Sequence, residues 1–179
     1  MENKYLKIGS VHVKQINEEV LYAEDDIVKV DGRDIESLKD QAIRNKRKRI
    51  RLCAHQGVDN KVHEMLIVHT KDTYVRPHKH LNKSESFHII EGSADVVIFD
   101  VDGNILEVIP MGDSLSGKIF FYRMNSSQYH TLKIDSDYLV FHEITSGPFD
   151  PADTVFAVWA PDEHDLLAVE RFKKRLDSK

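Results

Sequence analysis

The chain contains a histidine-rich segment that reads His78-Lys79-His80-Leu81-Asn82-Lys83-Ser84-Glu85 and is followed by Gly92. Side chains on a β-strand alternate between its two faces, so His78 and His80 share a face. Glu85 follows after enough residues for a tight turn into a second strand, which Gly92 ends. Two imidazoles and a carboxylate from adjacent strands form a metal site of nitrogen and oxygen ligands. His130 is the candidate for the fourth ligand.

Short predicted strands continue on both sides of this segment, over residues 49–160. Turn signals separate them every eight to twelve residues, as in Lys71-Asp72, Asp102-Gly103 and Asp135-Ser136-Asp137. The Asp-Gly pair is a strong hairpin signal. Regular spacing of this kind is typical of an all-β sandwich or barrel. The segment from Tyr74 to His80 is expected to form one strand.

The two ends of the chain have a different pattern. Residues 1–48 are predicted to form an extension of short strands, Val28–Val30 among them, and a helix over 34–47 with Asp34 as its cap. Residues 161–179 are predicted to form a C-terminal helix that opens at Pro161-Asp162. Its apolar positions share one stripe and should pack against the barrel: Leu166, Val169, Phe172 and Leu176. We therefore divide the chain into 1–48, 49–160 and 161–179.

The composition of the chain indicates which kinds of partner and which cellular compartment to expect. The formal net charge is −5, which argues against nucleic acid as a partner. Cys53 is the single cysteine, so no intramolecular disulfide can form, as is usual in a reducing compartment. The N-terminus has no apolar signal region, and no apolar run is long enough to span a bilayer. We expect a cytoplasmic protein with no membrane partner.

A basic run follows the predicted helix. It has two interpretations, a patch that binds anions or the solvated end of a helix, where cations complement the dipole. The second is favoured because no aromatic residue lies among the charges. The run comprises Arg44, Lys46, Arg47, Lys48, Arg49 and Arg51.

Other side chains near the histidine segment are candidates for secondary roles. Arg76 has the strand parity of His78, so it either binds an anionic group of a substrate or forms a salt bridge at the barrel mouth. Glu143 is a candidate acid or base close to the metal, or a paired surface carboxylate. His88 has the opposite parity to Glu85 and should point away from the metal. Core or surface roles are predicted for the remaining candidates, namely Cys53, His63, His69, Tyr74 and His142.

The spacing His78-x-His80-x4-Glu85-x6-Gly92 resembles the first sequence motif of the cupins, and the stretch ending in Tyr129-His130 resembles the second. A broader similarity is to the WbuC-type cupin-fold metalloproteins. Its residues are Arg76 to His80, Lys83, Glu85, Phe87-His88, Phe99-Asp100, Asp102-Gly103, His130-Thr131-Leu132, Gly147 to Asp150, and Trp159-Ala160-Pro161. The resemblance implies a cupin double-stranded β-helix, a jelly-roll barrel, with a mononuclear metal site at His78, His80, Glu85 and His130. It also implies a connection with surface-polysaccharide (O-antigen) biosynthesis.

Three functions are compatible with these features. The first is a metal-dependent isomerase, epimerase or modifying enzyme for a sugar or sugar-nucleotide, with an anionic sugar as the expected small-molecule substrate. The second is an Fe(II)-dependent dioxygenase, and the third is a non-catalytic sugar- and metal-binding module. Each requires one divalent transition metal ion, for which Zn, Fe, Mn and Ni are candidates. Because exposed sheet edges invite pairing, we also expect a homodimer.

Overall fold

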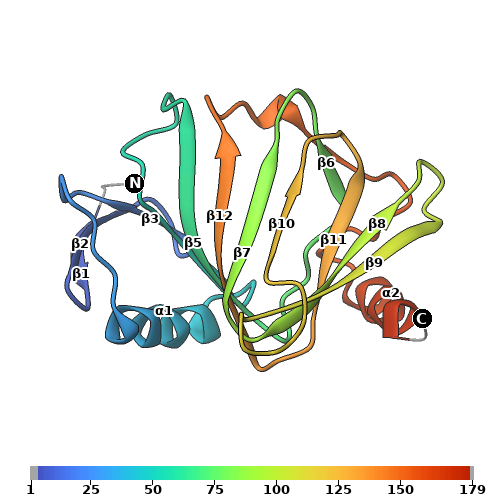
Figure 1. The fold of residues 1–179 in the computed structure, drawn as a ribbon, viewed down its shortest axis with the longest axis horizontal. Coiled ribbons are helices and arrows are strands. Elements are labelled where there is room, and N and C mark those ends of the chain that lie inside the picture. Colours follow the sequence, from blue (N-terminus) through green and yellow to red (C-terminus); the bar gives the residue numbers. More distant parts are fainter. Residues whose placement is uncertain (1–3, 178–179) are drawn as a thin grey trace.

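The computed structural model describes residues 4–177 and consists mainly of two β-sheets that face each other, with α1 and α2 at opposite ends (Figure 1). The larger sheet has eight strands in the order β1-β2-β3-β4-β5-β12-β7-β10. Their bounds are β1 (Lys4–Ile8), β2 (Val11–Gln15), β3 (Val20–Ala23), β4 (Arg49–Cys53), β5 (Val62–Thr70), β12 (Tyr138–Ser146), β7 (Glu85–Glu91) and β10 (Phe121–Met124).

The smaller sheet has five strands in the order β13-β6-β11-β8-β9. Their bounds are β13 (Thr154–Phe156), β6 (His78–His80), β11 (Tyr129–Ile134), β8 (Ser93–Phe99) and β9 (Ile105–Gly112). All pairings in this sheet are antiparallel. The all-β prediction is confirmed, and the arrangement is the cupin double-stranded β-helix.

The main core lies between the two sheets. Phe87, Ile89 and Phe141 from the larger sheet pack against Val96 and Leu132 from the smaller one. These side chains are buried because each strand presents alternate residues to the opposite sheet. Burial of this apolar surface is the main force that holds the barrel together.

The N-terminal strands continue the larger sheet, because β3 pairs in parallel with β4. Helix α1 (Gly32–Arg44) covers the outer face of this part, where Leu38 and Ala42 join a second core cluster with Ile50 and Leu52. Figure 1 shows α1 beneath these strands. The sheet and helix thus extend the barrel sideways, and α1 covers one face of β4.

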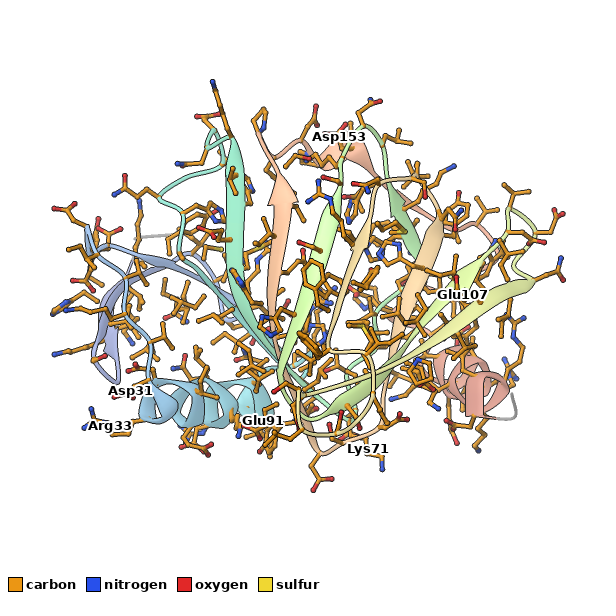
Figure 2. The ribbon with its side chains drawn as sticks, in the orientation of Figure 1. Asp31, Arg33, Lys71, Glu91, Glu107 and Asp153 are labelled. Atoms are coloured by element: carbon orange, nitrogen blue, oxygen red, sulfur yellow. The ribbon has the colours of Figure 1, made fainter. Side chains whose placement is uncertain are left out.

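The start of α1 corrects the predicted cap. Asp31, not Asp34, is the N-cap, and Asp34 is the third helical residue of a capping box that includes the Asp31 backbone. Asp34 also accepts a hydrogen bond from the Ser10 backbone, at 2.6 Å, which explains its complete burial. Arg33 pairs with Asp31 at this end of the helix (Figure 2). The helix ends at Arg44, and the residues predicted as a strand at 28–30 have no regular structure.

Helix α2 (Leu166–Asp177) packs on the outer face of the smaller sheet. Phe172 and Leu176 contact the cluster that contains Phe99 and Trp159, as the predicted stripe requires. Leu166 is 75% exposed, however, and the helix begins there rather than at Pro161. A 3-10 turn, η1 (Pro151–Asp153), precedes β13. Within residues 4–177, neither helix combines the length and apolar character required to cross a membrane.

Candidate metal centre

Strands β6 and β11 bring three histidines together. His78 and His130 are direct partners in the antiparallel pairing of these strands, and His80 lies two residues along on the face of His78. The predicted strand over 74–80 is wrong for its first half, because regular pairing begins only at His78. One ring nitrogen from each of His78, His80 and His130, which we call the three-histidine cluster, lies within 4.8 Å of the others.

Neighbouring polar groups orient these rings. The carbonyl of Arg76 lies 2.8 Å from His78 Nδ1, and that of Gln128 lies 3.0 Å from His130 Nδ1. A carbonyl can only accept, so each Nδ1 carries the hydrogen and each Nε2 keeps a free lone pair. Thr154 Oγ1, 3.2 Å from His80 Nδ1, can accept in the same way. Anchoring of one ring nitrogen while the other faces a common point is the usual arrangement of metal-binding histidines.

Glu85 reaches the cluster from β7 of the other sheet. Its Oε1 lies 3.0 Å from His130 Nε2, and its Oε2 lies 3.4 Å from His80 Nε2. Tyr122 on β10 donates a hydrogen bond of 3.0 Å to Oε1. Lys83, in the loop before Glu85, pairs with Asp153 at 3.2 Å on the upper rim of the barrel (Figure 2). The structure therefore brings together all four residues that the sequence motif predicted.

Tyr122 was missed by the sequence analysis. It lies on the strand next to β7, opposite Phe87, and its ring packs edge-on against that of Phe87. The sequence of β10 identifies Tyr122 only as an aromatic residue in a short strand and does not indicate that β7 is the neighbouring strand. Only the pairing of β10 with β7 reveals that the hydroxyl reaches Glu85.

The electrostatics of the cluster favour a metal ion. Burial and the neighbouring His130 and His80 lower the pKa of His78 to about 3, so its ring is neutral at physiological pH. Burial alone would raise the pKa of Glu85, but His130 and His80 hold it well below its usual range. Burial would lower the pKa of His130, yet the charge of Glu85 raises it.

The nitrogen Nε2 of His130 is the clearest indication that the cluster fits an ion. It is buried and has no aligned hydrogen-bond partner among residues 4–177, even though the Glu85 carboxylate lies 3.0 Å away. A buried polar atom without a partner is destabilising unless another group satisfies it. An ion placed among the three Nε2 atoms and the carboxylate would do so. The three-histidine cluster can hold a metal ion.

The cluster opens into a cavity of about 760 Å³ that lies between the sheets. Glu143 lines this cavity, and burial, followed by the negative charge of Glu85, raises its pKa to about 8. Arg76 also lines it, but its Nη1 is bound to Asp162 at 2.8 Å. Of the two interpretations of Arg76, the structure shows the salt bridge at the barrel mouth.

Two other histidines that the sequence analysis considered lie away from the three-histidine cluster. His88 is exposed on the outer face of β7, where it contacts Phe120, so its predicted orientation away from the metal is confirmed. His63 stacks on His55 at a centroid distance of 4.1 Å, and its Nε2 lies 3.1 Å from the Val58 carbonyl.

The remaining candidates also have structural roles. Burial raises the pKa of the Cys53 thiol to about 11, as expected for a small core residue. Tyr74 donates a hydrogen bond to the Pro161 carbonyl at 3.0 Å. His142 lies on β12, with its Nε2 4.0 Å from a Glu64 carboxylate oxygen.

Comparisons with known proteins agree with this architecture. The model of a domain of unknown function (DUF6016) matches residues 30–111, which is less than half of the chain. Curated proteins include no significant match to the sequence. Among solved structures, protein SO0799 from Shewanella oneidensis superposes with a TM-score of 0.52 at 12% identity, over 71% of this chain and 83% of that one.

Two further solved structures are similar at a lower level. They are the capsular polysaccharide assembling protein CapF from Staphylococcus aureus (TM-score 0.48, 18% identity, 63% of this chain and 32% of that one) and oxalate decarboxylase OxdC from Bacillus subtilis (TM-score 0.44, 18% identity, 55% and 25%). This chain spans only a quarter to a third of those two proteins. The fold and the cluster together define a cupin-like fold with three histidines that could hold a metal ion. A likeness at these identities bears on the fold alone.

Proposed function

We propose that this protein is a mononuclear metal-binding cupin that acts on a sugar or sugar-nucleotide in surface-polysaccharide biosynthesis. The observation that carries the proposal is the convergence of three histidines and Glu85 from both sheets at the side of a cavity of about 760 Å³. A site used only for structure would not need a cavity of this size beside it.

His78, His80 and His130 would hold the ion through Nε2, and Glu85 would provide the fourth ligand. Transition metals that bind histidine often take five or six ligands, so four protein ligands leave a position for a ligand molecule. A bound ion at this place would act as a Lewis acid toward a carbonyl, hydroxyl or phosphoryl oxygen. Tyr122 would keep the Glu85 carboxylate oriented through its hydrogen bond.

Glu143 is suited to proton transfer in the same cavity. Its raised pKa of about 8 means that the carboxyl group carries its proton at neutral pH. A cation at the histidines would add positive charge nearby and favour the ionised form. The residue could therefore give up a proton when the metal or a ligand changes the local charge.

The choice of a sugar as ligand rests on the resemblance to the WbuC-type cupins, whose members occur with O-antigen biosynthesis. The acidic net charge and the absence of a basic surface run with aromatic residues favour a small molecule over nucleic acid. The homodimer, the cytoplasmic location and the absence of a membrane partner stay predictions. Light scattering at high concentration would test the first of them.

Elemental analysis of freshly purified protein is the first test of this proposal. We expect about one equivalent of Zn, Mn, Ni or Fe per chain, lost on dialysis against a chelator while the β-sheet signal in circular dichroism is unchanged. Isomerisation or epimerisation of candidate sugar nucleotides, followed by NMR with metal-loaded and metal-free protein, then tests the reaction. Iron as the native metal, with oxygen consumed in the presence of substrate, would support the dioxygenase instead. Protein without any metal after expression in medium supplied with all four would contradict the proposal.

Metal affinity should fall as the pH is lowered from 7.5 to 5.5. A histidine must lose its proton to bind a metal, and the pKa of His130 lies above its ordinary value of about 6.5. A proton on His130 therefore competes with the ion more strongly as the pH falls, and the raised pKa moves this competition to a higher pH than for an ordinary imidazole. Competition with a zinc indicator across this range measures the effect. An affinity that is constant from pH 7.5 to 5.5 would show that His130 is not a ligand.

A further inference from the structure

The strand β4 places part of the basic run on the wall of the cavity. Ile50 and Leu52 point toward α1, so Arg49 and Arg51 face the other way and line the cavity with the three-histidine cluster. The interpretation of the run as a solvated helix end holds for Arg44, which is exposed in the last turn of α1. It does not hold for Arg49 and Arg51, which lie in a strand.

The arginines on this wall differ in their partners. Glu19 Oε2 lies 2.9 Å from Arg49 Nε and 3.3 Å from Arg47 Nη1, and Glu163 binds Arg47 at 2.7 Å. The Arg51 guanidinium has neither an ion pair nor a hydrogen bond to any residue in the range 4–177, and its Nε is buried without a partner. A guanidinium in such a place is stable only if water or a ligand satisfies its donors.

The surroundings of Arg51 would strengthen its interaction with an anion. Its direct neighbours across the sheet are Val20 on β3 and Ile67 on β5, so apolar side chains flank its stem. His69, the partner of Arg49 on β5, is buried, and its Nδ1 has no hydrogen-bond partner among the described residues 4–177. Two polar groups that lack partners thus lie at adjacent positions of one wall, where low solvent access reduces screening.

Arg51 interacts electrostatically with Glu143, because its positive charge opposes the rise in the Glu143 pKa caused by burial and by Glu85, but no ion pair joins the two within residues 4–177. Glu143 is two strands away on β12, in the row of Cys53 and Met65, which corresponds to about 10 Å between strand axes. Arg76, on the opposite side of the cavity, is already bound to Asp162. Among the arginines that line this cavity within residues 4–177, Arg51 is the one without an ion pair.

We propose that Arg51 binds a carboxylate or phosphoryl group of the small molecule whose other end lies at the three-histidine cluster. Strands β4 and β7 are three strand spacings apart in the larger sheet, about 14 Å, and this span suits a sugar that carries an anionic group. Arginine binds either oxyanion through two parallel hydrogen bonds. The inference deepens the proposed function, on which it rests for the ligand's metal-bound end.

Calorimetric titration with three sugars tests this inference: glucose 6-phosphate, glucuronate and uncharged glucose. The protein is used in its zinc-loaded and its metal-free form. We expect wild type to bind at least one of the two anionic sugars more tightly than glucose, and Arg51→Gln to lose about 10- to 100-fold for that sugar. Whichever anion shows the greater loss identifies the phosphoryl or the carboxylate group as the preferred partner.

Arg49→Gln is the matched control, because it removes the same charge from the same face of the same strand. Its guanidinium is bound to Glu19, so we expect less than about a threefold change in anion binding. Arg51→Lys keeps the charge but not the paired donors, and should lose an intermediate amount. If Arg51→Gln does not fold, the loss of anion binding in Arg51→Lys tests the role of Arg51 instead.

Equal losses in the Arg51 and Arg49 variants, or equal binding of glucose and both anions by wild type, would overturn the assignment. So would a wild type that binds none of the three sugars. If the protein holds no metal yet its anion binding still depends on Arg51, the proposed function fails and the anion site stands. If metal binds but anion binding does not depend on Arg51, only the inference about Arg51 fails.

Discussion

Replacing His78 by alanine is expected to weaken zinc binding by more than about 100-fold while the barrel stays folded. Loss of a residue that only orients a ligand already costs 10- to 100-fold in metal affinity, so loss of a ligand should exceed this. The fold should survive because Phe87, Phe141 and Leu132 build the core between the sheets without help from an ion. Equilibrium dialysis with zinc measures the affinity, and circular dichroism verifies the fold.

His88→Ala is the matched control for this experiment. His88 lies only three residues from Glu85 on β7, but it is exposed on the outer face of the barrel. The variant should keep wild-type zinc affinity. If His88→Ala releases the metal while His130→Ala retains it, the proposed ligand set is wrong. His80→Ala should behave like His78→Ala and provides an independent second variant.

Replacing Gly92 by alanine is expected to lower the free energy of unfolding by roughly 2–6 kcal/mol. Gly92 joins β7 to β8 with a φ of +85°, a region that residues with a Cβ rarely adopt. An added Cβ would also collide with the Tyr138 carbonyl and the Ser136 hydroxyl. Backbone strain and overpacking each contribute about 1–3 kcal/mol, and urea denaturation measures their sum.

Gly117→Ala separates these two contributions. Gly117 has a φ of +74°, but, apart from its two chain neighbours, no heavy atom of residues 4–177 lies within 4 Å of the position that its Cβ would occupy. This variant should therefore lose only the part due to backbone strain, about 1–3 kcal/mol. Equal losses in the two variants would show that the close approach of the Tyr138 carbonyl to Gly92 has no energetic consequence.

Much of the architecture was predictable from the sequence because its causes are local. Strand alternation placed His78 and His80 on one face and His88 on the opposite face from Glu85, and the structure has both arrangements. The hairpin at Asp102-Gly103 forms as predicted, with Gly103 at a φ of +85°. These features depend on neighbours only a few residues apart, so periodicity and turn chemistry suffice to predict them.

Element boundaries were less well predicted. The cap of α1 lies at Asp31 instead of Asp34, because both aspartates can cap and the Ser10 backbone recruits the second one. Helix α2 starts five residues after Pro161, since Asp162 is engaged by Arg76 and by the backbone of His164. In each case a contact with another side chain or with a distant part of the chain selected among equivalent local choices.

The spacing of apolar residues and turns was enough to predict an all-β barrel, the pair of histidines on one face and the carboxylate that follows them. From the sequence, His130 was only a candidate. The pairing of β11 with β6 brings it, 50 residues beyond His80, to the other two histidines, and the pairing of β10 with β7 brings Tyr122 to Glu85. Tertiary contacts also decided that Arg76 pairs with Asp162, while Arg51 has no ion pair or hydrogen bond in the part of the chain that the structure describes. Strand pairing and ion pairing between distant segments depend on which surfaces the whole chain buries, and no local pattern carries that information.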